Sequence, residues 1–332
     1  MENTQVCLKS HPQGMVDLAD FELRTVPTPT PREGQLLIKN LFLSVDPYMR
    51  GRMNAAKTYA ANFPVGEVIP GRTVGQVVSS RHPVFAEGDT VLTGLGWENF
   101  SLSDGDGLRK LPADAEHLST YLGVLGMPGF TGYYGLLHVG KPKPGETVYV
   151  SGAAGAVGSV VGQIAKLAGC RVVGSAGGPN KVAHLRELGF DETIDYRVAG
   201  NMRHAVAKAC PEGIDVYFDN VGGDTLEAAI ANMNQYGRIV ACGGISLYND
   251  AEPRPGPNNM FLVIGRRLTI QGFIVSDHVQ HQEAFERDMT RWLSEGHVRF
   301  DETVSEGIES APQAFINLFT GEKLGKQIVK LT

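Results

Sequence analysis

The sequence predicts an α/β protein in which a doubly wound parallel sheet follows a strand-rich N-terminal region. From about residue 145, short apolar runs alternate with helical patterns, and this order builds a parallel sheet with helices on both faces. Residues 1–120 instead carry β-branched segments separated by proline and glycine turns. The six apolar runs of the second region match the dinucleotide-binding sheet in number.

The expected elements follow in chain order. VPTPTP (26–31) is expected to be extended surface, because proline suits neither a helix interior nor a central strand. NKVAHLREL and DTLEAAIANMN are helical patterns, a charged helix lies near 278–295, and GKQIVKLT is expected to be a closing strand that folds back onto the first domain. The expected strands are 36–45, 71–80, 87–96, 147–151, 170–176, 192–196, 213–219, 238–244 and 268–275.

The composition excludes several classes of protein. With 332 residues, 42% hydrophobic and 20% charged, the chain suits a globular protein of about two domains. A formal charge of −6 and the lack of any Lys/Arg block argue against a nucleic-acid partner. Two uncharged windows, 118–140 and 147–165, are long enough to span a bilayer, but glycine, serine and threonine interrupt them, so we expect no membrane segment.

The expected location is the cytoplasm. The N-terminus has no apolar segment of the kind that a secretory signal needs. Four scattered cysteines suit a reducing compartment better than a disulfide framework, namely Cys7, Cys170, Cys210 and Cys242.

A glycine-rich turn, SGAAGAVG (151–158), joins an apolar strand to a helical pattern. Val157, Val160, Val161, Ile164 and Ala168 share one helical face, and Gly169 is placed to end the helix. Small residues allow the backbone to approach a pyrophosphate at a helix N-terminus, where N–H groups and the dipole attract it. We interpret Gly155, Ala156, Val157 and Gly158 as a phosphate-binding turn, although alanine stands at the usual first glycine.

The end of the second strand of this region indicates NADP. An NAD site places an acid there to bind the ribose hydroxyls, but SAGGPNK (175–181) contains none. Lys181 begins the next helix, and Tyr196-Arg197 closes the third strand. A nearby cation suits the 2′-phosphate of NADP. The alternative is that Lys181 is an ordinary solvated helix residue.

Several segments resemble the zinc-free medium-chain reductases, and within them the NADP-dependent alkenal/enone double-bond reductases. They are LFLSVDPYMRGRM (41–53), GMPGFTGYYGLL (126–137), SGAAGAVGSVVGQIAKLAGC (151–170) and GGISLYN (243–249). The resemblance covers nearly the whole chain. It implies a GroES-like substrate domain made of residues 1–122 and 299–332, around a Rossmann domain at 123–298 that binds NADPH. The implied activity is reduction of the carbon–carbon double bond of α,β-unsaturated aldehydes and ketones.

The resemblance also implies roles for individual residues. Lys181 and Tyr196 would contact the 2′-phosphate, Asn220 and Cys242 would line the cofactor groove, and the segment Phe273, Ile274 and Val275 would lie near the nicotinamide. Two positions depart from the pattern. Gly265 replaces a tyrosine that relatives often carry, which affects substrate positioning, and Lys323 replaces an asparagine, which affects one cofactor contact.

The zinc-ligand segments of related dehydrogenases are replaced here, so we expect no metal. Leu43-Ser44-Val45-Asp46 and Gly71-Arg72-Thr73 stand in those regions, and no cysteine cluster is present. His278 and His281, with Glu283, form the one remaining metal-like group, and we interpret them as a solvated helix face.

Conjugate reduction needs hydrogen-bond donors aimed at the developing enolate oxygen. A phenol, with an ordinary pKa of about 10, remains a donor at neutral pH. Tyr248 follows a glycine-rich loop after the fifth strand, at the carboxyl edge where ligands bind, and we favour it as that donor. Tyr48, in DPYMR, is the candidate second donor or substrate-orienting wall, and its alternative is an ordinary half-buried aromatic residue.

Two other functions stay open at this point: an NADPH:quinone oxidoreductase and a non-catalytic NADPH-binding protein. The expected assembly is a homodimer through the sixth strand, residues 268–275, because exposed sheet edges tend to be covered or paired. The resemblance implies the same pairing.

Overall fold

The computed structural model describes residues 2–56, 58–321 and 323–331, and the chain divides into two compact units. The first unit is Met1–Leu122, Glu302–Lys323 and Gln327–Thr332, and the second is Gly123–Asp301 and Leu324–Lys326. Residues 299–301 and 324–326, expected in the first domain, therefore belong to the second unit. Their hydrogen bonds explain this. The Arg299 N–H donates to Gln163 Oε1 at 2.8 Å, and the Gly325 N–H donates to the Ala154 carbonyl at 2.9 Å.

The second unit is built on a six-stranded parallel sheet with the order β10-β9-β8-β11-β12-β13. The chain runs outward from β8 to β10, returns to β11 beside β8, and continues outward to β13. The order reverses between β8 and β11, and ligands of such sheets bind outside the carboxyl ends of the strands there. The predicted doubly wound sheet is confirmed. Its strands are β8 (Thr147–Val150), β9 (Arg171–Ala176), β10 (Glu192–Asp195), β11 (Ile214–Asp219), β12 (Met233–Ala241) and β13 (Thr269–Gly272).

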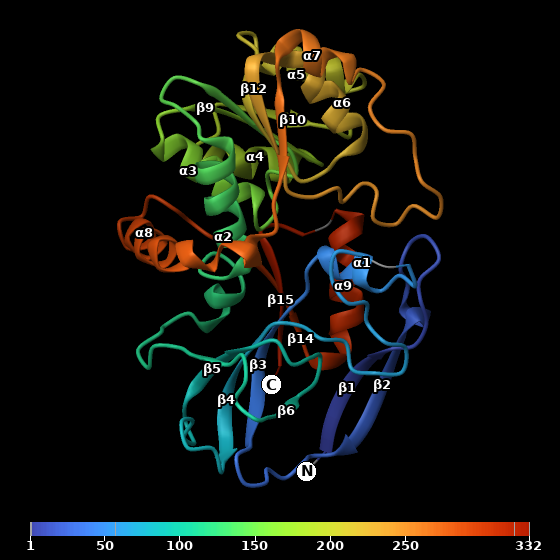
Figure 1. The fold of residues 1–332 in the computed structure, drawn as a ribbon, viewed down its shortest axis with the longest axis vertical. Coiled ribbons are helices and arrows are strands. Elements are labelled where there is room, and N and C mark those ends of the chain that lie inside the picture. The colour runs from blue at the N-terminus through green and yellow to red at the C-terminus, as the bar shows by residue number, and fades with distance from the viewer. Residues whose placement is uncertain (1, 57, 322, 332) are drawn as a thin grey trace. The chain divides into compact units, whose positions relative to one another are not determined.

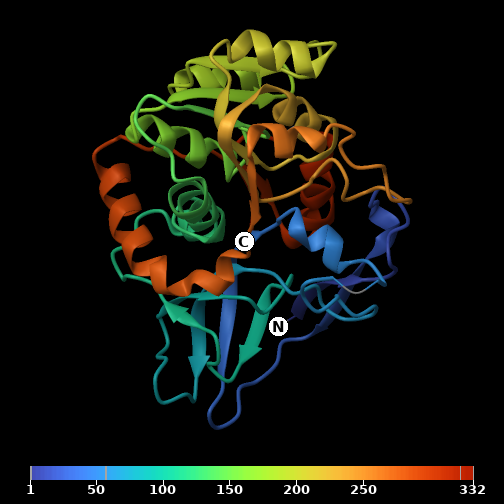
Figure 2. The same cartoon turned by 45° about the horizontal axis from the view of Figure 1, so that its top comes forward.

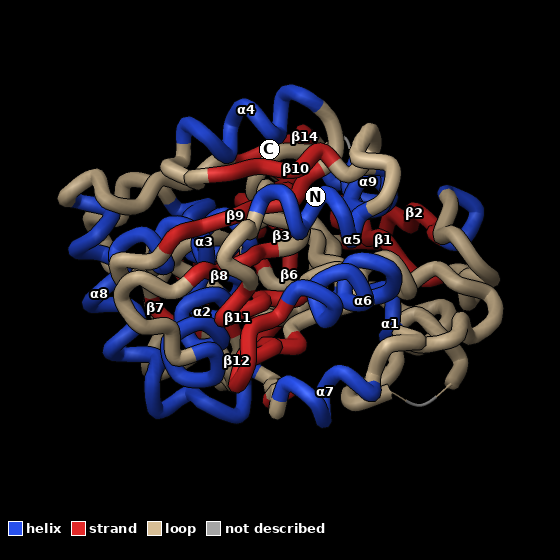
Figure 3. The backbone as a smooth tube through the Cα atoms, turned by 90° about the horizontal axis from the view of Figure 1, so that it is seen from above, coloured by secondary structure: helices blue, strands red, loops and turns tan. Residues whose placement is uncertain are grey.

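Helices cover both faces of this sheet (Figure 3). One hydrophobic cluster joins the sheet to α2, α3, α4 and α8, and a second joins its other face to α5, α6 and α7. Neighbouring residues of β8 enter different clusters, Val148 the first and Tyr149 the second, as expected for a strand. The helices are α2 (Met127–Tyr134), α3 (Gly158–Leu167), α4 (Pro179–Glu187), α5 (Met202–Ala209), α6 (Gly223–Asn232), α7 (Phe261–Arg266) and α8 (Gln282–Ser294).

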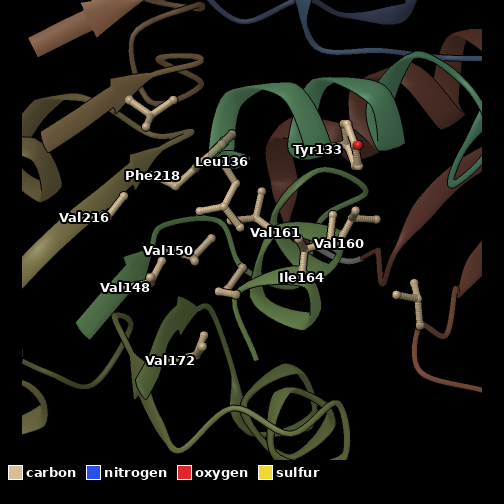
Figure 4. Packing of buried hydrophobic residues seen from close by; sticks show 14 of the residues in the cluster. Tyr133, Leu136, Val148, Val150, Val160, Val161, Ile164, Val172, Val216 and Phe218 are labelled. Carbon is tan, nitrogen blue, oxygen red and sulfur yellow. The ribbon is translucent and has the colours of Figure 1, made fainter. Parts of the chain in front are cut away.

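Helix α3 packs closely on the sheet (Figure 4). Val160, Val161 and Ile164 are buried, which confirms the predicted apolar face of this helix. A Cβ added to Gly162 would lie 1.9 Å from the Phe190 ring, so the helix can approach its neighbours this closely only with glycine here. Gly169 follows the last turn with φ of 77°, as expected for the residue that ends a helix.

Helix α2 continues into a π-helical segment, Gly135–Gly140, and lies beside α8 (Figure 2). The rings of Phe130 and Phe285 hold the two helices together, with centroids 5.3 Å apart. A 3₁₀ segment, Val275–His281, leads from the end of the sheet into α8.

The first unit contains the antiparallel strands of both chain ends (Figure 1). A seven-stranded sheet has the order β14-β15-β3-β4-β5-β7, with β6 paired to β3, and β1 pairs with β2 separately. Ile328 of β15 pairs with Ser44 of β3, which confirms that the closing strand folds back onto the N-terminal region. The strands are β1 (Glu2–Leu8), β2 (Phe21–Pro27), β3 (Leu36–Ser44), β4 (Thr73–Ser80), β5 (Thr90–Thr93), β6 (Phe100–Ser103), β7 (Arg109–Lys110), β14 (Glu302–Glu306) and β15 (Lys326–Lys330), and the helices are α1 (Tyr48–Arg52) and α9 (Ala311–Thr320).

Three strand predictions were wrong in length. Strand β5 covers Thr90–Thr93 rather than 87–96, β12 begins at Met233 rather than 238, and β13 covers Thr269–Gly272 rather than the eight residues 268–275. All four residues of β13 are exposed, so burial does not enforce an apolar alternation there. Within the described part of the chain, no helix has both the length and the apolar character needed to cross a membrane.

Candidate active site

The glycine-rich turn connects β8 to α3 at the switch point of the parallel sheet. A Cβ added to Gly158 would lie 2.5 Å from the Gly152 carbonyl oxygen and 2.7 Å from the Ala153 Cα, so the close packing of this turn requires glycine. The Ala153 N–H donates to the Ser175 carbonyl at 3.0 Å and ties the turn to β9. The predicted strand–turn–helix arrangement is confirmed.

Gly155, Ala156 and Val157 lie partly exposed in this turn, directly before α3 begins at Gly158. The first N–H groups of a helix have no partner within the helix and attract anions. The turn therefore fits the pyrophosphate of a dinucleotide, which is the role predicted for these four residues.

The C-terminal segment braces the same turn, which was not predicted from the sequence. Gly325 forms a parallel bridge with Gly155, and its N–H donates to the Ala154 carbonyl at 2.9 Å. Gly325 has φ of 64°, and an added Cβ would lie 2.0 Å from the Asp301 carbonyl oxygen. A glycine directly before the closing strand was the available signal, but its partner lies 170 residues earlier (325 − 155).

Positive charge gathers at the carboxyl end of β9. A Cβ added to Gly177 would lie 2.6 Å from the Tyr196 phenol oxygen and 3.0 Å from Arg197 Nε, so both side chains lie against this glycine. Burial, with the neighbouring charge of Arg197, lowers the pKa of Lys181. A guanidinium and a phenol against a glycine backbone, with a second cation close enough to interact with the first, fit a phosphate monoester.

An acid does approach this site, but it comes from β10 rather than β9. Asp195 Oδ1 accepts the Gly178 N–H at 2.9 Å and the Arg197 N–H at 3.0 Å. The carboxylate therefore stabilises the backbone around the two cations. As inferred from the sequence, the end of β9 carries no acid, but Asp195 of the neighbouring strand β10 was not predicted to lie here.

Asn220 and Cys242 lie at the carboxyl ends of β11 and β12. The Asn220 N–H donates to Ser151 Oγ at 3.0 Å, and its side-chain amide donates to the Ser151 carbonyl at 2.8 Å. The Cys242 N–H donates to the Asp219 carbonyl at 3.0 Å. Burial, and then the charge of Asp219, raise the pKa of the Cys242 thiol to about 12, so this residue is a neutral thiol at physiological pH.

The segment predicted to lie near the nicotinamide is divided between core and surface. The Phe273 ring lies 5.7 Å from the Tyr134 ring, and both Phe273 and Val275 pack against the core cluster. Of the three side chains, that of Ile274 is exposed, at 39%. Phe273 and Val275 are only partly buried, so their backbone and the exposed parts of their side chains are both accessible to a cofactor.

Tyr248 lies on the loop that follows β12. Its phenol oxygen accepts the Gly244 N–H at 3.2 Å, and a Cβ added to Gly243 would lie 3.1 Å from that oxygen. The loop places the phenol against glycine backbone at the carboxyl edge of the parallel sheet, as predicted from its position in the sequence.

Tyr48 begins α1 in the first unit. Burial, and then the charge of Asp46, raise its pKa above the ordinary value of about 10, so the hydroxyl remains protonated. Two residues on, Arg50 is 2% exposed and donates to the Gly14 carbonyl at 2.7 Å, the Pro12 carbonyl at 3.3 Å and Asn54 Oδ1. In DPYMR, Arg50 therefore anchors the segment that carries Tyr48.

The interpretation of His278, His281 and Glu283 as a solvated face holds for Glu283, which is exposed, but is wrong for the two histidines, which are half-buried. The His278 ring stacks on Tyr134 with centroids 4.0 Å apart, and the His281 ring lies 4.2 Å from His138. Burial and the neighbouring imidazoles lower the pKa of His138. Among the residues that the structure describes, no group of three or more His, Cys, Asp or Glu side chains is arranged to hold a metal ion.

The fold and the turn together define a Rossmann-type dinucleotide-binding protein with a separate β-rich unit. Residues 4–111 match the family model described as the N-terminal domain of oxidoreductase, and residues 156–295 match the model described as zinc-binding dehydrogenase.

Curated relatives match almost the full chain. The NADPH-dependent curcumin reductase of Escherichia coli K12 is 44% identical over 99% of this chain and 97% of its own length. Prostaglandin reductase 1 of Rattus norvegicus is 46% identical, over 97% of each chain. The NADP(+)-dependent 2-alkenal reductase of Nicotiana tabacum is 41% identical over 100% of this chain and 98% of its own.

The solved structure of CurA from Vibrio vulnificus in complex with NADPH superimposes with a TM-score of 0.95, at 43% identity over 99% of each chain. The chain belongs to the medium-chain dehydrogenase/reductase family, in the branch of these NADP-dependent reductases.

Proposed function

We propose that this protein is an NADPH-dependent reductase of the carbon–carbon double bond of α,β-unsaturated aldehydes and ketones. The observation that carries the cofactor is the positive charge at the carboxyl end of β9, where Arg197 and the phenol of Tyr196 lie against Gly177 and the charge of Arg197 acts on Lys181. The relatives above, named as alkenal, prostaglandin and curcumin reductases, support the substrate class.

Different residues of this chain bind different parts of the cofactor. The turn 155–158 holds the pyrophosphate through backbone N–H groups other than that of Gly155, which donates to the Gly152 carbonyl at 3.0 Å, while Lys181 and Tyr196 hold the 2′-phosphate. Asn220, Cys242 and the backbone of 273–275 line the groove. When bound, NADPH supplies the hydride that the β-carbon of the substrate accepts.

The charge that develops on the substrate oxygen needs a donor. Tyr248 donates its phenol proton in a hydrogen bond to this enolate oxygen, and its own oxygen is oriented by the Gly244 N–H. Tyr48, whose pKa is raised, is a neutral second donor or an orienting wall. The α-carbon then takes a proton from solvent.

Turnover with a substrate panel tests the proposal. NADPH oxidation is followed with enals, enones, quinones and saturated aldehydes, and the products are identified. We expect enals and enones to give saturated carbonyl compounds, and saturated aldehydes to remain unreacted. Turnover of quinones alone, or formation of alcohols from the carbonyl group, would contradict the proposal.

We also propose a cytoplasmic homodimer. The four cysteines are free, as in reducing compartments. The edge strand β13 is exposed along its length, and the nearby α7 exposes Phe261 at 70% and Ile264 at 80%. A second copy that pairs along β13 would cover this edge. Sedimentation should give twice the mass of one chain, and Ile264→Glu should shift it to one chain; a monomeric wild-type protein at micromolar concentration would contradict the dimer.

A further inference from the structure

A buried polar network lies beneath the carboxyl edge of the parallel sheet, and the proposed catalytic and cofactor-binding roles do not use it. The rings of Tyr149 and Tyr217 stack with centroids 5.1 Å apart. The Tyr149 hydroxyl donates to Ser175 Oγ at 2.9 Å, and the Tyr217 hydroxyl donates to Asp219 Oδ1 at 2.7 Å. The exposed fractions are 3% for Asp219 and 2% or less for the other three residues. Polar groups that are buried lose their hydrogen bonds to water, so these groups must form hydrogen bonds with one another.

Asp219 is the centre of this network. Besides Tyr217, its Oδ1 atom accepts the Gly222 N–H at 2.8 Å, the Val221 N–H at 3.0 Å and the Ser151 hydroxyl at 3.3 Å. Donors that converge on one oxygen are typical of an ionised carboxylate, because a protonated acid would itself be a donor. Burial raises the pKa of Asp219, and these donors offset part of that effect.

The network fixes the turn after β11. Gly222 has φ of 73° and Gly223 has φ of 52°, so the chain leaves the strand in a conformation that the Asp219 carboxylate must hold through two N–H groups. Asn220 is linked to Asp219 through Ser151, whose hydroxyl donates to Asp219 and whose Oγ accepts the Asn220 N–H.

The backbone of Asp219 fixes a second segment. Its carbonyl accepts the Cys242 N–H at 3.0 Å and the Gly243 N–H at 2.9 Å. These two residues begin the loop that carries Tyr248. One residue thus connects the end of β11 to the end of β12, on the side of the switch point where ligands bind.

We propose that Asp219 is a positioning residue of the cofactor groove, whose buried carboxylate holds Asn220 and the glycine turn in the geometry that binds NADPH. It acts through these neighbours rather than by touching the cofactor. The inference rests on the NADPH-binding part of the proposed function and is independent of the substrate.

The same strand offers a matched control. Asp215 lies four residues earlier, at the opposite end of β11, where its Oδ2 accepts the Thr147 N–H at 2.8 Å and its Oδ1 accepts the Asn234 amide at 2.8 Å. Asp219→Asn removes a buried carboxylate that accepts the Val221 and Gly222 N–H groups, and Asp215→Asn removes a half-buried one on the same strand that accepts the Thr147 N–H. If Asp219 only stabilised the fold, the loss of NADPH affinity in each variant would follow its loss of stability in thermal unfolding.

The test measures the dissociation constant of NADPH by fluorescence, together with thermal unfolding. We expect Asp219→Asn to weaken NADPH binding at least about tenfold, the scale of a hydrogen bond to a charged group, and Asp215→Asn to change it less than about twofold. Tyr217→Phe, which removes one donor, should weaken binding about threefold and keeps the test decisive if Asp219→Asn does not fold.

The pH dependence provides a second readout. Because burial raises the pKa of Asp219, its carboxylate is protonated at a higher pH than that of an ordinary aspartate. As the pH falls, the NADPH affinity of the wild type should therefore decrease more steeply than that of Asp219→Asn, which has no carboxylate to protonate. Tyr217, Tyr149 and Cys242 face the carboxylate, and all have raised pKa values, so they remain neutral. The titration of the 2′-phosphate is common to both proteins and cancels in the ratio of their affinities.

Three outcomes would overturn the inference: native NADPH affinity in Asp219→Asn, equal loss in Asp215→Asn, or identical pH curves for wild type and Asp219→Asn. If the wild-type protein itself binds no NADPH, the proposed function falls and the inference falls with it. If the wild type binds and Asp219→Asn binds equally well, the inference alone falls.

Discussion

Tyr48 and Tyr248 present the same chemical group on two different supports. Tyr48 is the first residue of α1, whose Met49 is fully buried and whose Arg50 guanidinium reaches back to the Gly14 carbonyl. Tyr248 lies on a loop rich in glycine, and its phenol accepts the Gly244 N–H of the same loop. The first position is set by side-chain packing around a helix and the second by backbone hydrogen bonds.

This difference separates two ways of placing a donor. A phenol fixed by a packed helix changes position only when that packing is broken. A phenol on a loop depends on the residues that hold the loop, here the Asp219 carbonyl that accepts the Cys242 and Gly243 N–H groups. The position of the Tyr248 phenol can therefore be changed by substitutions of residues that do not contact the substrate.

Exchange of the two phenols for phenyl rings tests the comparison most directly. Tyr248→Phe should lower kcat by about 10² to 10³, as the loss of one transition-state donor typically does, with little change in NADPH affinity. Tyr48→Phe is the matched variant and should lower kcat less, with its main effect on KM. Native enone turnover by Tyr248→Phe would show that the donor is elsewhere and make Tyr48 the next residue to test.

Disruption of the α1 support should act on folding. Arg50→Met keeps an apolar stem but leaves carbonyls of the 12–14 segment without their donor, so the free energy of unfolding should fall by about 3 kcal/mol. Arg52→Met is the control on the same helix. It loses one bond to the Ala61 carbonyl and a contact with the Phe63 ring, and should cost about 1 kcal/mol. Denaturant unfolding measures both, and equal costs would refute the anchor role of Arg50.

Lys181→Ala removes a cation from the cofactor site and leaves both tyrosines in place. The dissociation constant of NADPH should rise about tenfold, since a charge-assisted hydrogen bond is lost, while that of NADH stays unchanged. Titration calorimetry with the two cofactors gives both values. Equal affinity of the native protein for NADPH and NADH would contradict the 2′-phosphate assignment.

Metal removal should have the smallest effect. A bound Lewis acid would polarise the substrate carbonyl and make a phenol donor unnecessary, but Val45, Asp46 and Arg72 stand where related dehydrogenases carry ligands. Dialysis against a chelator should leave the rate unchanged. A loss that added zinc alone restores would show that a metal, and not either tyrosine, bears the developing charge.

The sequence predicted the parts of the fold that depend on local pattern. Buried strands such as Thr147–Val150 are continuous apolar runs, because helices cover both faces of a parallel sheet. The glycine turn and its helix were predicted because small residues between an apolar strand and a helical pattern are typical of a turn that admits a phosphate. The ends of three strands, β5, β12 and β13, were predicted wrongly. Strand β13 is exposed throughout, and the first residues of β12 include Tyr236, which is 66% exposed with φ of 63°.

The site residues that were missed depend on contacts distant in sequence. Three of the donors to Asp219 lie within three residues of it, but its burial and its bond from Ser151, 68 residues away, depend on the fold and could not be predicted from the local sequence. Arg197 was noted in the sequence only as the end of a strand, and its place against Gly177 follows from the pairing of β9 with β10. His278 and His281 were misread because the residues that cover them, Tyr134 and His138, come from another helix.

The bridge between Gly155 and Gly325 has a consequence for biosynthesis. Chains fold progressively during translation, with N-terminal parts first. Gly325 follows every strand of the parallel sheet in the chain, since the last of them, β13, ends at Gly272. The nascent chain can therefore build the sheet around Gly155 before the residue that braces the phosphate turn has been synthesised. A chain that stops before Gly325 would keep the six strands of the parallel sheet but lack the brace of the nucleotide turn.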